Sequence, residues 1–381
     1  MRKLKIKNFK CFIDKEISLS NLTVLAGGNG AGKSTVIQTF LLFAQSFKSS
    51  TSLNLSNKLY LNDYYTELGN SKSLLNYDAN NETIEFEFTD DNDKSINFKY
   101  KYDEEIDSNI FELLNKEEVI RNLKESNALN FVNYFEFIGA DRLGPKTFHH
   151  TDKNFTELRV GKIGEYSALI FEKHKMEILP NGKNLRDNVN EVLSNIFDFV
   201  NIDTEFNKKA NIAMFEIKNH PLSTEYESPV NMPYGVSYIL PIIISCLVRQ
   251  IDKTKIIENY QYKQEENEII IIENPEAHLH PSAQSKLGYF LAKISNHIQI
   301  IIETHSEHII NGIRLATLED DINNNNISIN FFSSNKKSFE PNIQNIKIDQ
   351  FSDLTDWPIG FFDQQEADIR EIFEHRRKNR K

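Results

Sequence analysis

The sequence predicts an α/β fold with a mostly parallel sheet and an antiparallel subsheet, on three observations. A glycine-rich stretch, "GGNGAGKS" at 27–34, lies between a predicted strand and a predicted helix. Residues 269–272 are consecutive isoleucines, as expected of a central parallel strand that is covered on both faces. The segment 83–102 alternates twice around "DDND", which indicates an antiparallel hairpin.

The start of the chain is expected to supply two strands and one helix. Residues 3–7 alternate, with Leu4 and Ile6 on one face and lysines on the other, so a half-buried strand is predicted. Its lysines would discourage pairing at an exposed sheet edge. Residues 21–28 are predicted to be a strand that leads into the glycine loop, and 34–47 a mostly apolar, buried helix.

The middle of the chain is expected to interrupt the main domain. Residues 104–130 are predicted to form a charged helix, and 134–145 a strand that ends in a loop. A mixed, largely helical insertion is predicted around 147–228, with helices near 163–174 and 185–200.

The last third alternates strands with helices. An amphipathic helix is predicted over 282–295 and a buried strand over 297–302. The stretch "THSE" at 304–307 fits a capping box, with Thr304 as the N-cap and Glu307 reaching back to it. A new helix should therefore begin here.

A small C-terminal appendage of α+β type is expected after a polar loop at 320–326. Its predicted strands are 327–332 and 343–348. The predicted organisation is therefore a main domain over 1–326, with the insertion around 147–228, and an appendage over 327–381.

Composition excludes several classes of protein. No apolar run reaches the roughly 18 residues of a membrane-spanning helix, and the charged N-terminus lacks the apolar stretch of a signal peptide. Cys11 and Cys246 lie far apart, which suits a reducing cytoplasm. The net charge of −11 disfavours nucleic acid as the main partner. Two basic patches, 1–10 and 375–381, remain candidate DNA contacts or plain solvated ends.

The stretch "GGNGAGKS" satisfies the pattern G-x-x-x-x-G-K-[ST] of a phosphate-binding loop, in the strand–loop–helix context that this motif requires. Its glycines let main-chain N–H groups surround phosphates at a helix N-terminus. Lys33 would reach the β- and γ-phosphates and Ser34 would hold Mg²⁺. The candidate ATP-binding residues here are Gly27, Asn29, Gly30, Ala31, Gly32, Lys33, Ser34 and Thr35.

A phosphate-binding loop needs an acidic residue at the end of a neighbouring strand to hold the metal. Glu273 follows the four isoleucines, and ligands of open α/β sheets bind at the carboxyl ends of the strands. Glu273 is therefore the predicted Walker B acid and, with Ser34, the predicted Mg²⁺ ligand. It is longer by one methylene than the usual Asp.

Four motifs follow one another along the chain: "GGNGAGKS", "PYGVS", "ENPEAHLHP" and "ETHSEHII". In this order the chain resembles ABC-type ATPase heads of the RecF, SMC and OLD group. The opening "IKNFKCF" is similar to the start of those heads. The ending "DWPIGFFDQ" resembles a C-terminal region of unknown function on a bacterial subgroup. The resemblance covers both ends of the chain better than its middle.

The resemblance implies that two ATP molecules are held between two subunits. The loop 231–241 takes the place of the signature loop, and Gly235 and Ser237 begin an apolar helix whose N-terminus suits an anion. The alternative is an ordinary helix cap. His305 matches a histidine that contacts the γ-phosphate.

Two further nucleotide contacts are implied less directly. The stretch "GADRLGP" at 139–145 lies where a glutamine loop is expected but contains no Gln, so Asp141 or Arg142 is the candidate substitute. Lys10, with Phe9 and Phe12, is placed to border the nucleotide base, unless the two aromatic residues belong to the core.

Asn274 is the main departure from the family pattern. The resemblance puts a glutamate here that activates the attacking water, whereas an amide is no general base at neutral pH. Asn274 would orient water instead, as a glutamine does in some GTPases. Glu276 or His305 is the alternative base. Slow hydrolysis is therefore expected.

Three rival functions are also compatible with parts of the sequence. A metallohydrolase would use His278, His280, His305 and His308 with Glu276 and Glu307. A nuclease on the same chain would need a Glu and a D-x-D pair, and 327–381 contains no D-x-D. A non-hydrolysing scaffold would use ATP only to hold a partner.

The resulting expectation is a cytoplasmic ATPase that uses ATP and Mg²⁺ and forms a homodimer or higher oligomer around the nucleotide. It would control a separately encoded effector such as a nuclease, in defence against phage. DNA repair or DNA-end sensing is the alternative. No extended heptad run is visible, so a long SMC-type rod is not expected.

Overall fold

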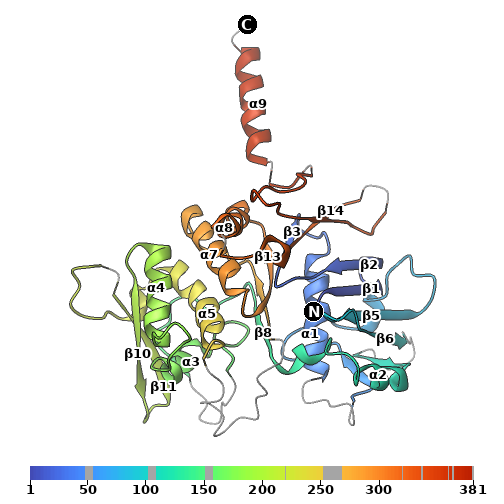
Figure 1. Ribbon diagram of the computed structural model, residues 1–381, viewed down its shortest axis with the longest axis horizontal. Coiled ribbons are helices and arrows are strands. Elements are labelled where there is room, and N and C mark those ends of the chain that lie inside the picture. Colours follow the sequence, from blue (N-terminus) through green and yellow to red (C-terminus); the bar gives the residue numbers. More distant parts are fainter. Residues whose placement is uncertain are drawn as a thin grey trace.

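The computed structural model describes residues 1–47, 55–101, 109–150, 158–218, 220–251, 268–319, 321–335, 338–358, 360–362 and 364–379. Figure 1 shows a central sheet with an antiparallel sheet to one side and a mixed lobe to the other. The C-terminal helix α9 (Gln364–Asn379) projects away from both.

The central sheet has the strand order β15-β14-β3-β13-β12-β8. All neighbours pair in parallel except β15, which is antiparallel to β14. The strands are β3 (Leu22–Gly27), β8 (Phe135–Ile138), β12 (Ile269–Glu273), β13 (Gln299–Thr304), β14 (Ile327–Ser333) and β15 (Asn342–Ile346). The predicted mostly parallel sheet is therefore confirmed.

The strands expected in the C-terminal appendage belong to this sheet. β14 pairs with β3 from Ile327 opposite Leu22 to Phe332 opposite Gly27. A division of the chain at residue 326 therefore separates two hydrogen-bonded neighbours. Nothing in the local pattern of 327–333 revealed this partner, because it lies about 300 residues earlier in the chain.

The antiparallel sheet has the order β2-β1-β5-β6-β7-β4. Its strands are β1 (Lys3–Phe9), β2 (Phe12–Ser18), β4 (Lys58–Tyr60), β5 (Thr83–Thr89), β6 (Ser95–Lys101) and β7 (Ile110–Leu113). β1 lies between β2 and β5, so its lysines do not protect an edge. Lys3 and Lys5 instead pair with Glu16 at 3.3 Å and Asp14 at 3.2 Å on β2.

The isoleucine run of β12 divides between two cores. Ile269 and Ile271 pack in the cluster that contains α1 (Lys33–Phe47) and the inner face of the antiparallel sheet. Ile270 and Ile272 face the opposite cluster, formed with helices α5 (Tyr234–Val248), α7 (Pro281–Ile294) and α8 (Glu307–Leu318). All four side chains are fully buried, which contributes about 1.5–3 kcal/mol each.

The expected insertion forms the lobe that is green in Figure 1. The two predicted helices are present as α3 (Ser167–His174) and α4 (Leu185–Phe197). The prediction missed a three-stranded sheet, β10-β11-β9, made of β9 (His149–His150), β10 (Asn201–Asn207) and β11 (Ile212–Lys218).

The prediction of a long charged helix over 104–130 is wrong for residues 109–130, which the structure describes. Strand β7 (Ile110–Leu113) joins the antiparallel sheet, and α2 (Lys116–Asn122) is short. Pairing of β7 with β4 and β6 outweighs the helical preference of the neighbouring charged residues. Residues 102–108 lie outside the described residues.

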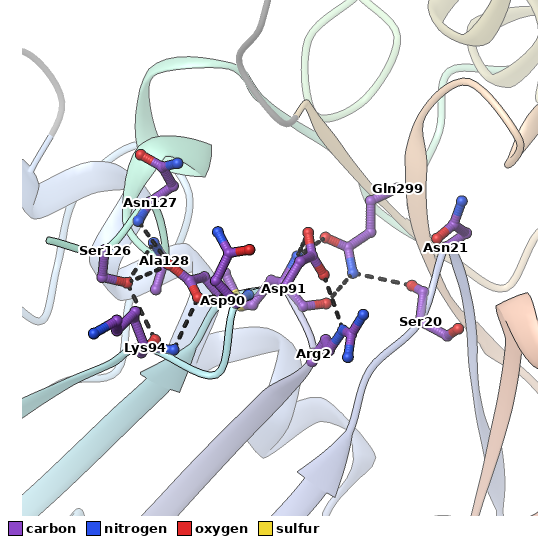
Figure 2. A network of polar contacts seen from close by, with 12 residues as sticks. Arg2, Ser20, Asn21, Asp90, Asp91, Lys94, Ser126, Asn127, Ala128 and Gln299 are labelled. Atoms are coloured by element: carbon purple, nitrogen blue, oxygen red, sulfur yellow. Dashed lines mark hydrogen bonds and ion pairs between the residues drawn. The ribbon is translucent and has the colours of Figure 1, made fainter.

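A polar network joins the two sheets at the end opposite the glycine loop (Figure 2). The Gln299 amide donates to the carbonyls of Met1 at 2.7 Å and Ser20 at 2.9 Å. In the same network the Asp90 carboxylate accepts bonds from the Lys94 N–H at 2.9 Å, the Asn127 N–H at 3.0 Å and the Ser126 hydroxyl at 2.9 Å. Burial opposes ionisation of Asp90, but these bonds hold its pKa below the ordinary value.

We therefore predict that Asp90→Asn destabilises the protein by about 1–3 kcal/mol at neutral pH. Because the pKa of Asp90 is lowered on folding, its contribution is present above the ordinary Asp pKa and is lost as the pH falls through the folded value. Urea denaturation at several pH values measures this. Asp93→Asn, in the exposed part of the same turn, is the control and should unfold like the unchanged protein.

Candidate functional site

The glycine loop connects the end of β3 to the start of α1, as predicted. Gly30 and Gly32 have φ values of 73° and 97°, and Gly27 of 133°, which favour glycine. A Cβ on Gly27 would lie 2.1 Å from the Phe332 carbonyl oxygen of β14. The loop therefore requires glycine both for its backbone conformation and for its contact with the neighbouring strand.

Lys33 lies folded against its own loop. Its Nζ donates to the carbonyl oxygens of Gly27 at 2.9 Å and Gly28 at 2.8 Å. The side chain is buried, and burial lowers the pKa of the Lys33 ammonium despite the nearby Glu303 carboxylate, 3.6 Å away. Ser34, the next residue, is exposed.

Glu303 is the site residue that was not predicted from the sequence. It is the last residue but one of β13, between β3 and β12, and its carboxylate oxygens lie 3.3 and 3.5 Å from the Ser34 hydroxyl. A signal was present in the sequence: Glu303 follows isoleucines 300–302 as Glu273 follows its own run of isoleucines. Glu303 also begins the motif "ETHSEHII", in which the resemblance gives a role to His305.

Glu273 lies opposite Glu303 in the parallel register of β12 and β13. One carboxylate oxygen accepts a bond from the Ala140 N–H at 3.3 Å. Burial, and secondly the charge of Glu303, raise the pKa of Glu273 to about 7. Two carboxylates and a hydroxyl are oxygen ligands of the kind that Mg²⁺ prefers, so Ser34, Glu273 and Glu303 fit this cation.

Arg142 lies in this region but is not placed to bind a nucleotide. Its guanidinium donates to the carbonyl oxygens of Gly139, Glu273 and Asn274, each at 2.7 Å. The side chain is almost fully buried, and burial lowers its pKa to about 10. The interpretation of Arg142 as a substitute for the missing glutamine is therefore unsupported; it fixes the main chain at 273–274.

Asn274 has an unusual conformation and an incompletely bonded side chain. Its φ is 44°, and its N–H donates to the Glu303 carbonyl at 2.9 Å. Within the described part of the chain, the buried Asn274 Oδ1 accepts no hydrogen bond. This oxygen therefore has an unused acceptor position.

Glu276 is occupied by hydrogen bonds from the end of β13. Its carboxylate accepts bonds from the Thr304 hydroxyl at 2.8 Å and the His305 N–H at 2.7 Å. Glu276 therefore holds the loop that carries His305, whose side chain is exposed. This geometry suits a positioning residue better than a base.

The capping box predicted at 304–307 is wrong in its N-cap. Ser306 is the N-cap of α8, and its hydroxyl accepts bonds from the N–H groups of His308 at 3.1 Å and Ile309 at 3.2 Å. Thr304 ends β13 and donates to Glu276 instead. The strand extends further than the sequence pattern indicated, which moves the start of the helix.

The loop 231–241 begins α5, as predicted. A Cβ on Gly235 would lie 2.9 Å from the His278 carbonyl oxygen, so this glycine packs inside the subunit. Ser237 is buried, and its hydroxyl has no hydrogen-bond partner among the described residues. Tyr234 is instead 60% exposed at this helix end.

Lys10 lies in the tight turn between β1 and β2, beside α1. Its Nζ donates to the Gln38 side chain at 2.6 Å. Phe9 and Phe12 are fully buried, so the alternative that they belong to the core is correct. The adjacent Cys11 lies next to the glycine loop, because a Cβ on Gly32 would lie 2.9 Å from its sulfur.

The histidines of the rival metal site have other surroundings. His278 packs against the Tyr238 ring at 4.4 Å, and the His280 side chain caps α7. Among the described residues, no three His, Cys, Asp or Glu side chains form a group suited to a metal ion. No helix in the described part of the chain is long and apolar enough to span a membrane.

With this geometry established, the comparisons with known proteins identify the family. Residues 22–311 match the profile described as "AAA domain, putative AbiEii toxin, Type IV TA system". The chain belongs to this family. Residues 322–372 match a second profile, described as "Protein of unknown function (DUF3696)". The comparison with curated proteins gave no significant match.

Solved structures of SMC head domains are similar to this chain. A SmcHead bound to the C-winged helix domain of ScpA is 13% identical, with a TM-score of 0.50, covering 91% of this chain and 98% of that chain. The SMC head domain from Thermotoga maritima is 12% identical, with a TM-score of 0.45 and coverages of 90% and 98%. The Pyrococcus furiosus Smc head with an extended coiled coil, bound to the C-terminal domain of ScpA, is 13% identical, with a TM-score of 0.48 and coverages of 98% and 99%.

These findings confirm an SMC-head-like α/β fold and a P-loop ATPase domain of the AAA type. The assignment of individual site residues remains a prediction from geometry.

The raised pKa of Glu273 predicts that the stability of the protein, without nucleotide or metal, depends on pH. The folded protein holds a proton up to pH about 7, whereas the ordinary value is 4.5. The free energy of unfolding should therefore fall by about 3 kcal/mol as the pH rises between these values. Glu273→Gln should remove this part of the slope.

Chemical denaturation between pH 4.5 and 8 measures this effect. Glu205→Gln, on the exposed side of β10, should leave the pH profile unchanged. Parallel profiles for the unchanged protein and Glu273→Gln would contradict the prediction.

Proposed function

We propose that this protein binds ATP with Mg²⁺ in its glycine loop, hydrolyses it slowly, and uses it to hold two copies of the chain together. One observation carries the proposal. Lys33 and Ser34, at the start of α1, lie beside the Glu303 carboxylate, and Glu273 lies opposite Glu303 at the end of the neighbouring buried strand. This combination of a cation, a hydroxyl and acidic groups suits a triphosphate with its metal.

Binding would begin at the loop itself. Main-chain N–H groups and the N-terminal end of α1 favour an anion. Lys33 would exchange the Gly27 and Gly28 carbonyls for phosphate oxygens, and this exchange offsets part of the cost of burying its charge. Mg²⁺, when bound by Ser34 and the carboxylates, would supply the charge that neutralises the phosphates.

The surroundings of the attacking water support slow hydrolysis. Asn274 offers an amide oxygen that orients water without accepting its proton. The Glu276 carboxylate is already bonded to Thr304 and His305. His305 is held by this bond with its side chain exposed, and is the remaining group for the γ-phosphate.

The dimer would form where α5 begins. Gly235 and Ser237 are turned into the subunit, so contact with a second nucleotide falls to the main chain at this helix end and to exposed Tyr234. Tyr234, Tyr238 and His278 pack as an aromatic group beside it. A second copy would cover this group.

Control of a separate effector rests on the family likeness alone. The family's description names a toxin of a toxin–antitoxin system, which supports a two-component defence role in the cytoplasm. The N-terminal basic patch is a poor candidate for DNA contact, because Lys3, Lys5 and Lys7 lie within 4 Å of acidic residues on β2. The exposed end of α9, with Arg376 and Arg377, is the better candidate.

Asn274 also supports a second candidate, an ATP-dependent scaffold without turnover. The two differ in which variants lose biological function. For a scaffold, Lys33→Ala removes function whereas Asn274 and His305 variants keep it. For an ATPase, all three classes of variant impair it.

Lys33→Ala should weaken ATP binding by at least about tenfold, because the charged hydrogen bonds of its ammonium are lost. Calorimetry with Mg²⁺ and ATP measures the affinity, and light scattering with and without ATP measures the dimer. Lys286→Ala, an exposed lysine on α7, should retain both properties. ATP-dependent dimer formation by the Lys33→Ala variant would contradict the proposal.

Asn274→Glu should accelerate single-turnover ATP hydrolysis, by about 10²–10⁴-fold if the new carboxylate acts as a full general base. The rate is measured with enzyme in excess over labelled ATP. Asn274→Gln, which keeps an amide, is the matched control and should stay slow. A rate for Asn274→Glu no faster than that of the unchanged protein would count against the explanation of slow turnover.

A further inference from the structure

We infer that Glu303 is a ligand of the divalent cation, beside Ser34 and Glu273, and that it makes nucleotide binding depend strongly on this cation. The inference rests on the proposed function and deepens it. In the loop 139–145, where Asp141 or Arg142 was expected to replace the missing Gln, Arg142 is engaged by main-chain carbonyls.

The first argument is the spacing of oxygen atoms. The Glu303 carboxylate oxygens lie 3.3 and 3.5 Å from the Ser34 hydroxyl, longer than the usual O–H···O bond of about 2.7–2.8 Å. Neighbouring oxygens on an octahedral Mg²⁺, with bonds of about 2.0–2.1 Å, lie about 3 Å apart. Small shifts would therefore bring both groups onto one ion.

The second argument is the place of Glu303 in the sheet. Parallel pairing puts Glu273 opposite Glu303, and Glu303 opposite Leu25 near the end of β3. Both carboxylates thus reach the same edge of the sheet as the glycine loop. The Glu303 side chain is 10% exposed, so its charge is poorly screened by solvent.

The third argument concerns Lys33, the other charged neighbour of Glu303. The alternative explanation for Glu303 is that it serves only as the ion-pair partner of Lys33. However, Lys33 already has two carbonyl acceptors at 2.8 and 2.9 Å, and Glu303 is more distant at 3.6 Å. Glu303 thus keeps a negative charge beside the glycine loop, and a triphosphate that enters without a cation meets its repulsion.

Binding of a fluorescent ATP analogue, in EDTA and in Mg²⁺, tests the inference. Glu303→Gln should bind the analogue in EDTA at least as tightly as the unchanged protein, because a repelling charge is gone. Its gain in affinity on adding Mg²⁺ should shrink by about tenfold or more. Glu307→Gln, at the start of α8, is the control and should keep the full gain.

A second readout follows the metal directly. Electron paramagnetic resonance with Mn²⁺ and a non-hydrolysable ATP analogue should show about tenfold weaker Mn²⁺ binding in Glu303→Gln than in the unchanged protein. Glu303→Asp, which keeps the charge but retracts the oxygens, should also weaken Mn²⁺ binding. It keeps the test usable where Glu303→Gln unfolds, as monitored by thermal denaturation.

The outcomes separate the two proposals. An unchanged protein that binds no nucleotide with Mg²⁺ overturns the proposed function itself. Normal binding in the unchanged protein, with equal changes for Glu303→Gln in EDTA and in Mg²⁺, identifies a plain ion pair with Lys33 and overturns the inference. Unaltered Mn²⁺ affinity in both Glu303 variants overturns it as well.

Discussion

The parallel pairing of β3, β13 and β12 is the constraint on which the rest of the site depends. In this register the glycine loop, Glu303 and Glu273 end side by side, although they lie far apart in the sequence. Buried isoleucines on both faces hold the strands in place. A slip of one residue would move the Glu273 and Glu303 side chains to the opposite face of the sheet. The chemistry of the site therefore depends on apolar packing that contains no reactive group.

Two polar side chains hold this edge of the sheet without taking part in the proposed chemistry. Arg142 ties the loop after β8 to the end of β12, and Glu276 ties the turn after β12 to the end of β13. Each bonds to the main chain, so each sets the conformation of a neighbour: Asn274 in one case and His305 in the other. The motif "ENPEAHLHP" contains both residues proposed to react and a supporting residue, Glu276, and the sequence alone does not distinguish them.

The motifs predicted the glycine loop and Glu273 because their chemistry depends on local spacing. Glu303 was not predicted, although the same pattern of isoleucines precedes it and it begins the motif "ETHSEHII", because the family resemblance gave a role only to His305 in that motif. The main-chain contacts of Arg142 were not predictable because its partners are carbonyls, which a sequence does not display. The place of β14 was not predictable from 327–333, because its partner strand is distant and pairing between distant segments leaves no local periodicity. Ser306 displaced Thr304 as the helix cap because β13 continues to Thr304.

The contact of Gly27 with Phe332 has a consequence for how the molecule is made. The strand that ends in the glycine loop remains an unprotected sheet edge on one side until β14 is added to it. During synthesis the ribosome must therefore release more than 300 further residues before this side of the loop is complete. Contacts of such long sequence separation form slowly. The nascent chain would thus acquire its complete phosphate-binding shape only after β14 has been synthesised, long after the loop itself has left the ribosome.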